Sequence, residues 1–97
     1  MKFLLTIFIL IPVLANSQSA EEYYNRGNAK NNQKDYSGAI SDYNKAIEIN
    51  PNYAETYYYR GIAKINISQK NSGCLDLSKA GELGYEKAYE MINKYCK

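Results

Sequence analysis

A duplication with a period of 34 residues constrains this 97-residue chain more than any other feature. When residues 20–50 are shifted onto residues 54–84, thirteen of the thirty-one aligned positions are identical, and no gap is needed. Periods of this length are typical of repeat proteins, in which each unit buries its apolar face by stacking on its neighbour. The sequence therefore predicts two stacked units within residues 18–84, one over 20–53 and one over 54–84, followed by a closing segment over 85–97.

Each unit has the pattern of two helices. One face of the first helix follows the i, i+3, i+4, i+7 spacing, and in the first unit it consists of Tyr23, Arg26, Gly27 and Lys30. A polar stretch over residues 31–35 interrupts this pattern, and Asp35 is a suitable N-cap for a second helix. The apolar stripe of that second helix is Ala39, Ile40, Tyr43, Ala46 and Ile47. Asn50-Pro51 ends it, because proline cannot continue the hydrogen-bond ladder.

Gly27 and Gly61 lie at equivalent positions in the middle of the two predicted first helices. Glycine inside a helix is about 1 kcal/mol less favourable than alanine. Its recurrence predicts that a neighbouring backbone approaches closely at this position, with the rings of Tyr23 and Tyr57 filling the space beside it. A heptad coiled coil is the alternative packing, but a heptad would not preserve glycine at a 34-residue spacing.

With these residues the chain resembles the tetratricopeptide repeat family. That family has an aromatic, a leucine-like residue, glycine, an aromatic, alanine, an aromatic, alanine and proline at fixed offsets. The first unit carries Tyr23, Arg26, Gly27, Lys30, Ala39, Tyr43, Ala46 and Pro51 there, and the second carries Tyr57, Arg60, Gly61, Lys64, Gly73, Leu77, Ala80 and, one place early, Gly84. Basic residues and Gly73 depart from the pattern, but long basic stems can cover apolar surface. The resemblance implies an all-α fold of two helical hairpins and a capping helix, a fragment of an α-solenoid.

The resemblance also implies a binding face, because in this family the first helix of each repeat lines a concave groove. The positions that it places there are Glu21, Tyr24, Asn25, Asn28 and Asn32 in the first repeat, and Glu55, Tyr58, Tyr59, Ile62 and Asn66 in the second. Tyrosine rings offer contact area, and amides can bond an extended backbone, so this set suits peptide capture. Some relatives grip a C-terminal carboxylate with a lysine and an asparagine; Asn28 matches the asparagine, but Tyr24 replaces the lysine. The alternative is that these tyrosines extend the packing or meet a second copy.

The closing segment predicts one more amphipathic helix, with an apolar stripe of Tyr85, Ala88, Tyr89, Ile92 and Tyr95. Such a helix would cap the stack. Cys74 lies ten residues before Gly84 and Cys96 lies twelve after it, on helices that we expect to be antiparallel neighbours. We therefore predict a disulfide, which would contribute about 3 kcal/mol in the chain-entropy model. Two free thiols, with Cys74 as a small core residue, are the alternative.

The first seventeen residues have the pattern of a secretory signal peptide. Lys2 is followed by an almost wholly apolar run over residues 3–14, and Ala15 and Ser17 supply the small residues of a cleavage site. Cleavage falls before Gln18 or before Asn16. An uncleaved membrane anchor is the alternative, but a spanning helix needs about 20 apolar residues, and this run is shorter and contains Pro12. We therefore expect export to the periplasm or the cell exterior, without membrane attachment after cleavage.

Composition excludes several kinds of function. The chain has no histidine, so a nucleophile lacks its usual base, and two cysteines fall short of the four ligands of a zinc site. Without Lys2 the basic count falls from twelve to eleven against ten acidic residues, which does not indicate a nucleic-acid binder. We expect no catalytic residue, metal or cofactor. The predicted function is a non-enzymatic module that binds a protein or peptide, and the alternative is a self-associating scaffold of the cell envelope.

Overall fold

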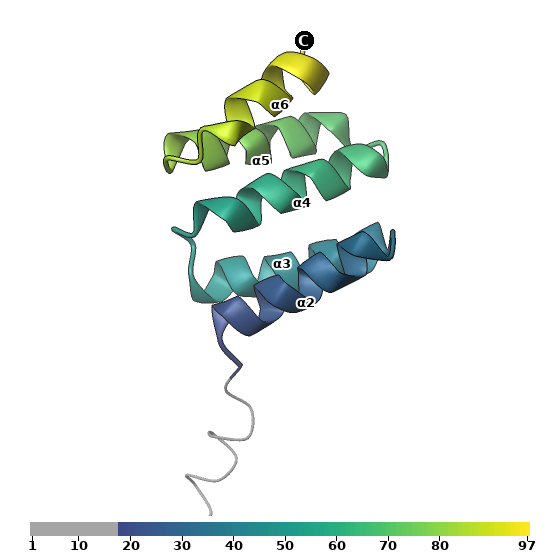
Figure 1. The fold of residues 1–97 in the computed structure, drawn as a ribbon, viewed down its shortest axis with the longest axis vertical. Coiled ribbons are helices and arrows are strands. Elements are labelled where there is room, and N and C mark those ends of the chain that lie inside the picture. The colour runs from purple at the N-terminus through teal and green to yellow at the C-terminus, as the bar shows by residue number, and fades with distance from the viewer. Residues whose placement is uncertain (1–17) are drawn as a thin grey trace, which may run out of the picture.

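A computed structural model describes residues 18–97 as five helices stacked in chain order (Figure 1). The helices are α2 (Ala20–Asn32), α3 (Tyr36–Ile49), α4 (Ala54–Asn66), α5 (Lys70–Glu82) and α6 (Lys87–Tyr95). This part of the chain contains no strand, which confirms the predicted all-α fold. The pairs α2–α3 and α4–α5 are the two helical hairpins, and α6 lies at the end of the stack. The predicted signal peptide, residues 1–17, lies outside the described residues, and among residues 18–97 no helix is long and apolar enough to cross a membrane.

The helix ends follow from local sequence. The Asp35 side chain accepts a hydrogen bond from the backbone N–H of Gly38 at 3.0 Å, which confirms the predicted N-cap of α3. Helix α3 ends at Ile49, directly before the Asn50-Pro51 pair. Gly84 has a φ of 102°, in the left-handed region that glycine enters without strain, and it turns the chain from α5 toward α6. Helix α6 begins at Lys87, two residues after the start of the predicted stripe.

The two mid-helix glycines meet different neighbours. A Cβ on Gly61 would lie 2.7 Å from the backbone oxygen of Gly73, so α4 and α5 approach each other backbone to backbone, as the glycine predicts. A Cβ on Gly27 would instead lie 2.6 Å from the ring of Tyr43. The prediction of a close backbone approach is therefore wrong for Gly27, because Ala39 stands where the second repeat has Gly73 and the Tyr43 ring fills the extra space.

The core of the stack is made of small residues and a few large ones. Its fully buried side chains include Ala39, Tyr43, Ala63, Leu77 and Ala80. Tyr57, Ala80 and Ala88 form one buried cluster, which joins α4, α5 and α6. Because Ala88 is fully buried in this cluster, α6 covers the apolar end of the second repeat, as a capping helix should.

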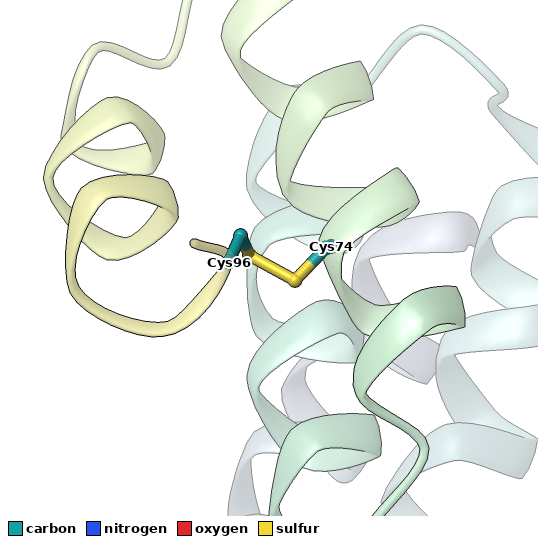
Figure 2. The surroundings of a disulfide bond; sticks show 2 residues. All are labelled: Cys74 and Cys96. Atoms are coloured by element: carbon teal, nitrogen blue, oxygen red, sulfur yellow. A yellow bond between two sulfur atoms is a disulfide. The ribbon is translucent and has the colours of Figure 1, made fainter.

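A disulfide fixes the capping helix to the second repeat. Cys74 on α5 and Cys96 at the end of α6 are bonded, with their Cα atoms 5.8 Å apart (Figure 2). This confirms the predicted pairing, and no free thiol remains among the described residues. The bond and the buried Ala88 together hold α6 at its two ends.

Candidate functional site

A continuous row of tyrosine rings runs across the stack, and we call it the tyrosine ladder. Its members are Tyr53, Tyr24, Tyr59, Tyr58 and Tyr85. Successive ring centroids are 5.0, 6.1, 5.0 and 4.8 Å apart, and the rings meet edge to face or tilted. The ladder brings together three predicted groove residues, Tyr24, Tyr58 and Tyr59. It adds two residues from the turns before α4 and α6 that the sequence did not assign to the site.

Each ladder ring is half-buried, so it packs against its neighbours and also reaches solvent. Burial is the largest cause that raises the pKa of Tyr53 and of Tyr85, each to about 12. Burial is also the first cause that raises the pKa of Tyr24 and Tyr58. At neutral pH these four tyrosines are therefore uncharged phenols, which can donate and accept hydrogen bonds and offer ring edges for contact.

The predicted amides of α2 have different surroundings. The hydroxyl of Tyr43 donates a hydrogen bond to Oδ1 of Asn28, so that amide supports the buried Tyr43 ring. Asn25 and Asn32 are exposed on α2. The structure places neither of them in the ladder.

An apolar hollow of about 120 Å³ lies between α4 and α6, and we call it the α4–α6 hollow. Its lining residues are Ile62, Ile65, Asn66, Met91 and Tyr95. Ile62 and Asn66 are predicted groove residues, whereas the other three were missed. Ile65 lies one turn beyond Ile62, which the periodicity could have suggested. Met91 and Tyr95 line this hollow because of the way in which α6 packs on the second repeat, which the sequence pattern does not specify.

A second hollow, of about 270 Å³, lies beside the start of α2. Its lining residues are Ala20, Glu21, Asn50 and Tyr53. Glu21 is a predicted inward position, and Tyr53 is the first ring of the ladder. This hollow therefore continues the ladder to the N-terminal end of the stack.

Two matching ion clusters hold the helices of each repeat together. Asp42 accepts hydrogen bonds from Nε and Nη2 of Arg26 at 3.1 and 2.8 Å, and its other partner is Nζ of Lys30 at 2.9 Å. In the second repeat Asp76 accepts from Arg60 at 2.8 and 2.7 Å and pairs with Lys64 at 2.9 Å. Both carboxylates are buried. The guanidinium of Arg26, first among the causes, lowers the pKa of Asp42 below its ordinary value.

These clusters explain why basic residues stand at positions where the repeat pattern has an aromatic or a leucine-like residue. Their side chains are bidentate or charge-assisted donors to a buried carboxylate on the second helix. The sequence alone predicted only that their stems cover apolar surface. The signal for the clusters was present, since Arg, Lys and Asp are identical in the two repeats at the same spacing.

The arrangement of residues 18–97 offers surfaces for contact. Within this range no group of three histidine, cysteine, aspartate or glutamate side chains is placed to hold a metal ion. The two cysteines are joined in the disulfide, and the two buried aspartates are held by arginine and lysine. What this part of the chain presents to a partner is half-exposed rings, exposed amides and two hollows.

Two models of one family match the chain. Both are described as tetratricopeptide repeat, and they cover residues 20–53 and residues 42–75. The first range coincides with the first predicted repeat, and the second runs from within α3 into α5. Together they span residues 20–75, which is more than half of the chain. Comparison with curated proteins finds no match.

Proposed function

The chain belongs to the tetratricopeptide repeat family, and from this premise we propose that it is a non-enzymatic module that binds an extended peptide segment of another protein. Repeats of this family suggest protein–protein interaction, and the finer proposal depends on one observation. That observation is the tyrosine ladder, which connects α2, α4 and the turn before α6 through half-exposed rings.

The physical reason is that tyrosine gives contact area at low entropic cost. A tyrosine ring has only two side-chain torsions, and here each ring is already held by its neighbours. A peptide that settles on the ladder would therefore lose little freedom of the receptor side chains. Two hollows offer space for guest side chains: one contains Tyr53, the first ring of the ladder, and the other is the α4–α6 hollow at the far end of α4.

We also propose that the protein acts outside the cytoplasm, in the periplasm or the cell exterior. Two features support this location: the signal-peptide pattern of residues 1–17 and the disulfide, since disulfides persist in oxidising compartments. Expression of the full chain in an exporting bacterial host tests it. We expect the intact mass to match a chain that begins at Gln18 or Asn16; recovery of the full-length chain in the membrane fraction would contradict export with cleavage.

Selection of random peptides of about eight residues on the exported protein tests the binding proposal. We expect saturable binding that weakens about tenfold or more in the double variant Tyr24→Ala, Tyr58→Ala, which removes two ladder rings. Tyr23→Ala is the matched control, because Tyr23 is a half-buried tyrosine of α2 outside the ladder. Circular dichroism of all variants checks that they remain helical. Equal binding by wild type and double variant would remove the proposal.

Self-association is the competing function. The large apolar side chains that the described residues expose, namely Ile49, Leu75, Tyr89 and Tyr95, come from three different helices. Single exposed apolar residues are common on monomeric proteins. Light scattering separates the two functions: a monomer at high micromolar concentration is expected for the peptide-binding module, and a concentration-dependent oligomer would favour the scaffold.

A further inference from the structure

The two ion clusters have an effect on charge at the ladder. Helices α2 and α4 together carry four basic residues, and each of them pairs with a buried aspartate of the second helix of its repeat. The same two helices carry the glutamates Glu21, Glu22 and Glu55, and no ion pair involves these within residues 18–97. The clusters therefore pair the positive charge of α2 and α4 with carboxylates of α3 and α5 and leave the negative charge of α2 and α4 unpaired.

Glu55 is the carboxylate most closely associated with the ladder. It lies one turn before Tyr58 and Tyr59 on the same face of α4. Its negative charge adds to the burial that raises the pKa of Tyr24, Tyr53 and Tyr85, three rings from three different elements. The charge of Glu55 thus acts on ladder rings from α2 and from the turns before α4 and α6, and Tyr58 and Tyr59 lie one turn further along its own helix.

A second carboxylate lies near the same end of the ladder. Glu90 of α6 contributes to the raised pKa of Tyr58, after burial and Tyr59. Carboxylates beside aromatic rings attract ammonium and guanidinium groups, because the charge and the ring faces act in the same direction. The surface around Glu55 and the tyrosine ladder is therefore complementary to a lysine or arginine side chain.

The opposite end of α4 has a different character. The α4–α6 hollow is lined mainly by apolar side chains, and Lys94 stands over the ring of Tyr95, with its Nζ 5.2 Å from the centroid. A cationic guest side chain is disfavoured here and an apolar one is favoured. Glu55 and Ile65 are ten positions apart on one helix, which is about 15 Å. An extended chain covers that distance in about four or five residues.

We propose that α4 and α6 bind an extended peptide segment that carries one basic and one large aliphatic side chain. The lysine or arginine side chain lies at Glu55 and the tyrosine ladder, and the aliphatic side chain lies in the α4–α6 hollow. The two guest residues are about four residues apart, in either order. This inference rests on the proposed function and names the chemistry of the partner. It gives the two ion clusters a role, because they pair the basic residues of α2 and α4 with buried aspartates while the glutamates of the same helices stay unpaired.

Peptide selection on the exported full chain also tests this inference. We expect the selected sequences to be enriched in Lys or Arg at about four residues from Leu, Ile or Met. One selected peptide is then synthesised with arginine and with citrulline, its uncharged analogue. Citrulline is expected to weaken binding to the wild type about tenfold and to change binding to Glu55→Gln little, because the carboxylate partner is already absent.

Glu48→Gln is the matched control, since Glu48 is an exposed glutamate of α3. It should keep the wild-type preference for arginine over citrulline. If the selected peptides lack basic residues, or if citrulline weakens wild type and Glu55→Gln equally, this inference falls while ladder-dependent peptide binding stands. If no peptide is selected above the Tyr24→Ala, Tyr58→Ala background, the proposed function falls with it.

Discussion

The two repeats contain the same ion cluster in different surroundings. The side chain of Arg26 is 47% exposed and that of Lys30 is 35% exposed, whereas Arg60 and Lys64 are 17% and 14% exposed. The first repeat stands at one end of the stack, and the second lies between it and α6 (Figure 1). Identical residues are thus placed once near water and once inside the stack.

The inner cluster also connects the repeats. Nη1 of Arg60 donates to Oδ1 of Asn44 on α3 at 2.9 Å, in addition to its two bonds to Asp76. Charges that are less exposed to water interact more strongly, but they also lose more when one partner is removed. Position in the stack therefore sets the exposure of each cluster, and we expect the inner cluster to contribute more to stability than the outer one.

The largest expected effect follows from removing the inner carboxylate. We predict that Asp76→Asn lowers the free energy of unfolding by about 3–5 kcal/mol, because Arg60 and Lys64 would keep their charges in a buried place without a carboxylate. Asp42→Asn should cost less than half as much, because its partners can turn to water. Urea denaturation followed by circular dichroism measures both. Equal losses would contradict the difference between the repeats.

The disulfide distinguishes the two ends of the stack. We predict that Cys74→Ser together with Cys96→Ser lowers the free energy of unfolding by about 3 kcal/mol, from the chain entropy of a loop of about twenty residues. Hydrogen exchange should show the loss of protection first in α6 and α5, which the bond joins, and later in α2 and α3. A uniform loss across both repeats would show that the disulfide does not act locally. Chemical reduction of the wild-type disulfide should have the same effect as the double substitution.

Much of the fold could be predicted because its signals are local. The cap at Asp35, the stop at Pro51 and the turn at Gly84 each depend on one residue and its neighbours in the chain. The 34-residue period then gives the stacking, because each repeated unit buries its apolar face against its neighbour. The pairing of Cys74 with Cys96 follows from arms of nearly equal length around one turn.

The rest of the site depends on how the helices are placed relative to one another, and no local sequence pattern contains that information. Tyr53 joins the ladder only because the turn between α3 and α4 brings its ring to within 5.0 Å of Tyr24. Met91 and Tyr95 line a hollow because α6 is seated on α5, where the Tyr89 ring occupies the space beside Gly81. The ion clusters are a different case: their residues were visible as identities, but their sixteen-residue spacing was not recognised as a contact between paired helices.

The two mid-helix glycines give a smaller contrast between the repeats. We predict that Gly61→Ala lowers the free energy of unfolding by about 2 kcal/mol, because the new Cβ meets the backbone oxygen of Gly73 and the helices must separate. Gly27→Ala should cost about 1 kcal/mol or less, since the Tyr43 ring can tilt and alanine favours the helix. Thermal unfolding measures the difference. A larger loss for Gly27→Ala would mean that the buried ring is less adaptable than the backbone contact.

The smallest expected effect is a dependence on pH in the outer cluster. The pKa of Asp42 in the folded chain lies below its ordinary value of 3.8. As the pH falls, the unfolded chain therefore takes up the proton first. The contribution of Asp42 to stability is complete above the ordinary value and is lost as the pH falls through the lowered one. We predict that wild type and Asp42→Asn differ in urea midpoint at neutral pH and converge on acidification.

Convergence is informative because both proteins share every other acidic group. Those groups change the absolute midpoints equally, so they cancel in the difference between wild type and Asp42→Asn. Asp35→Asn is the matched control: Asp35 is an exposed aspartate whose side chain caps α3, and asparagine caps a helix about as well. Its difference from wild type should stay small at every pH. If the Asp42→Asn difference stays constant on acidification, the charge of Asp42 does not stabilise the outer cluster, and the hydrogen bonds of its side chain do. The clusters of the two repeats would then differ in their exposure to water but not in the contribution of charge to stability.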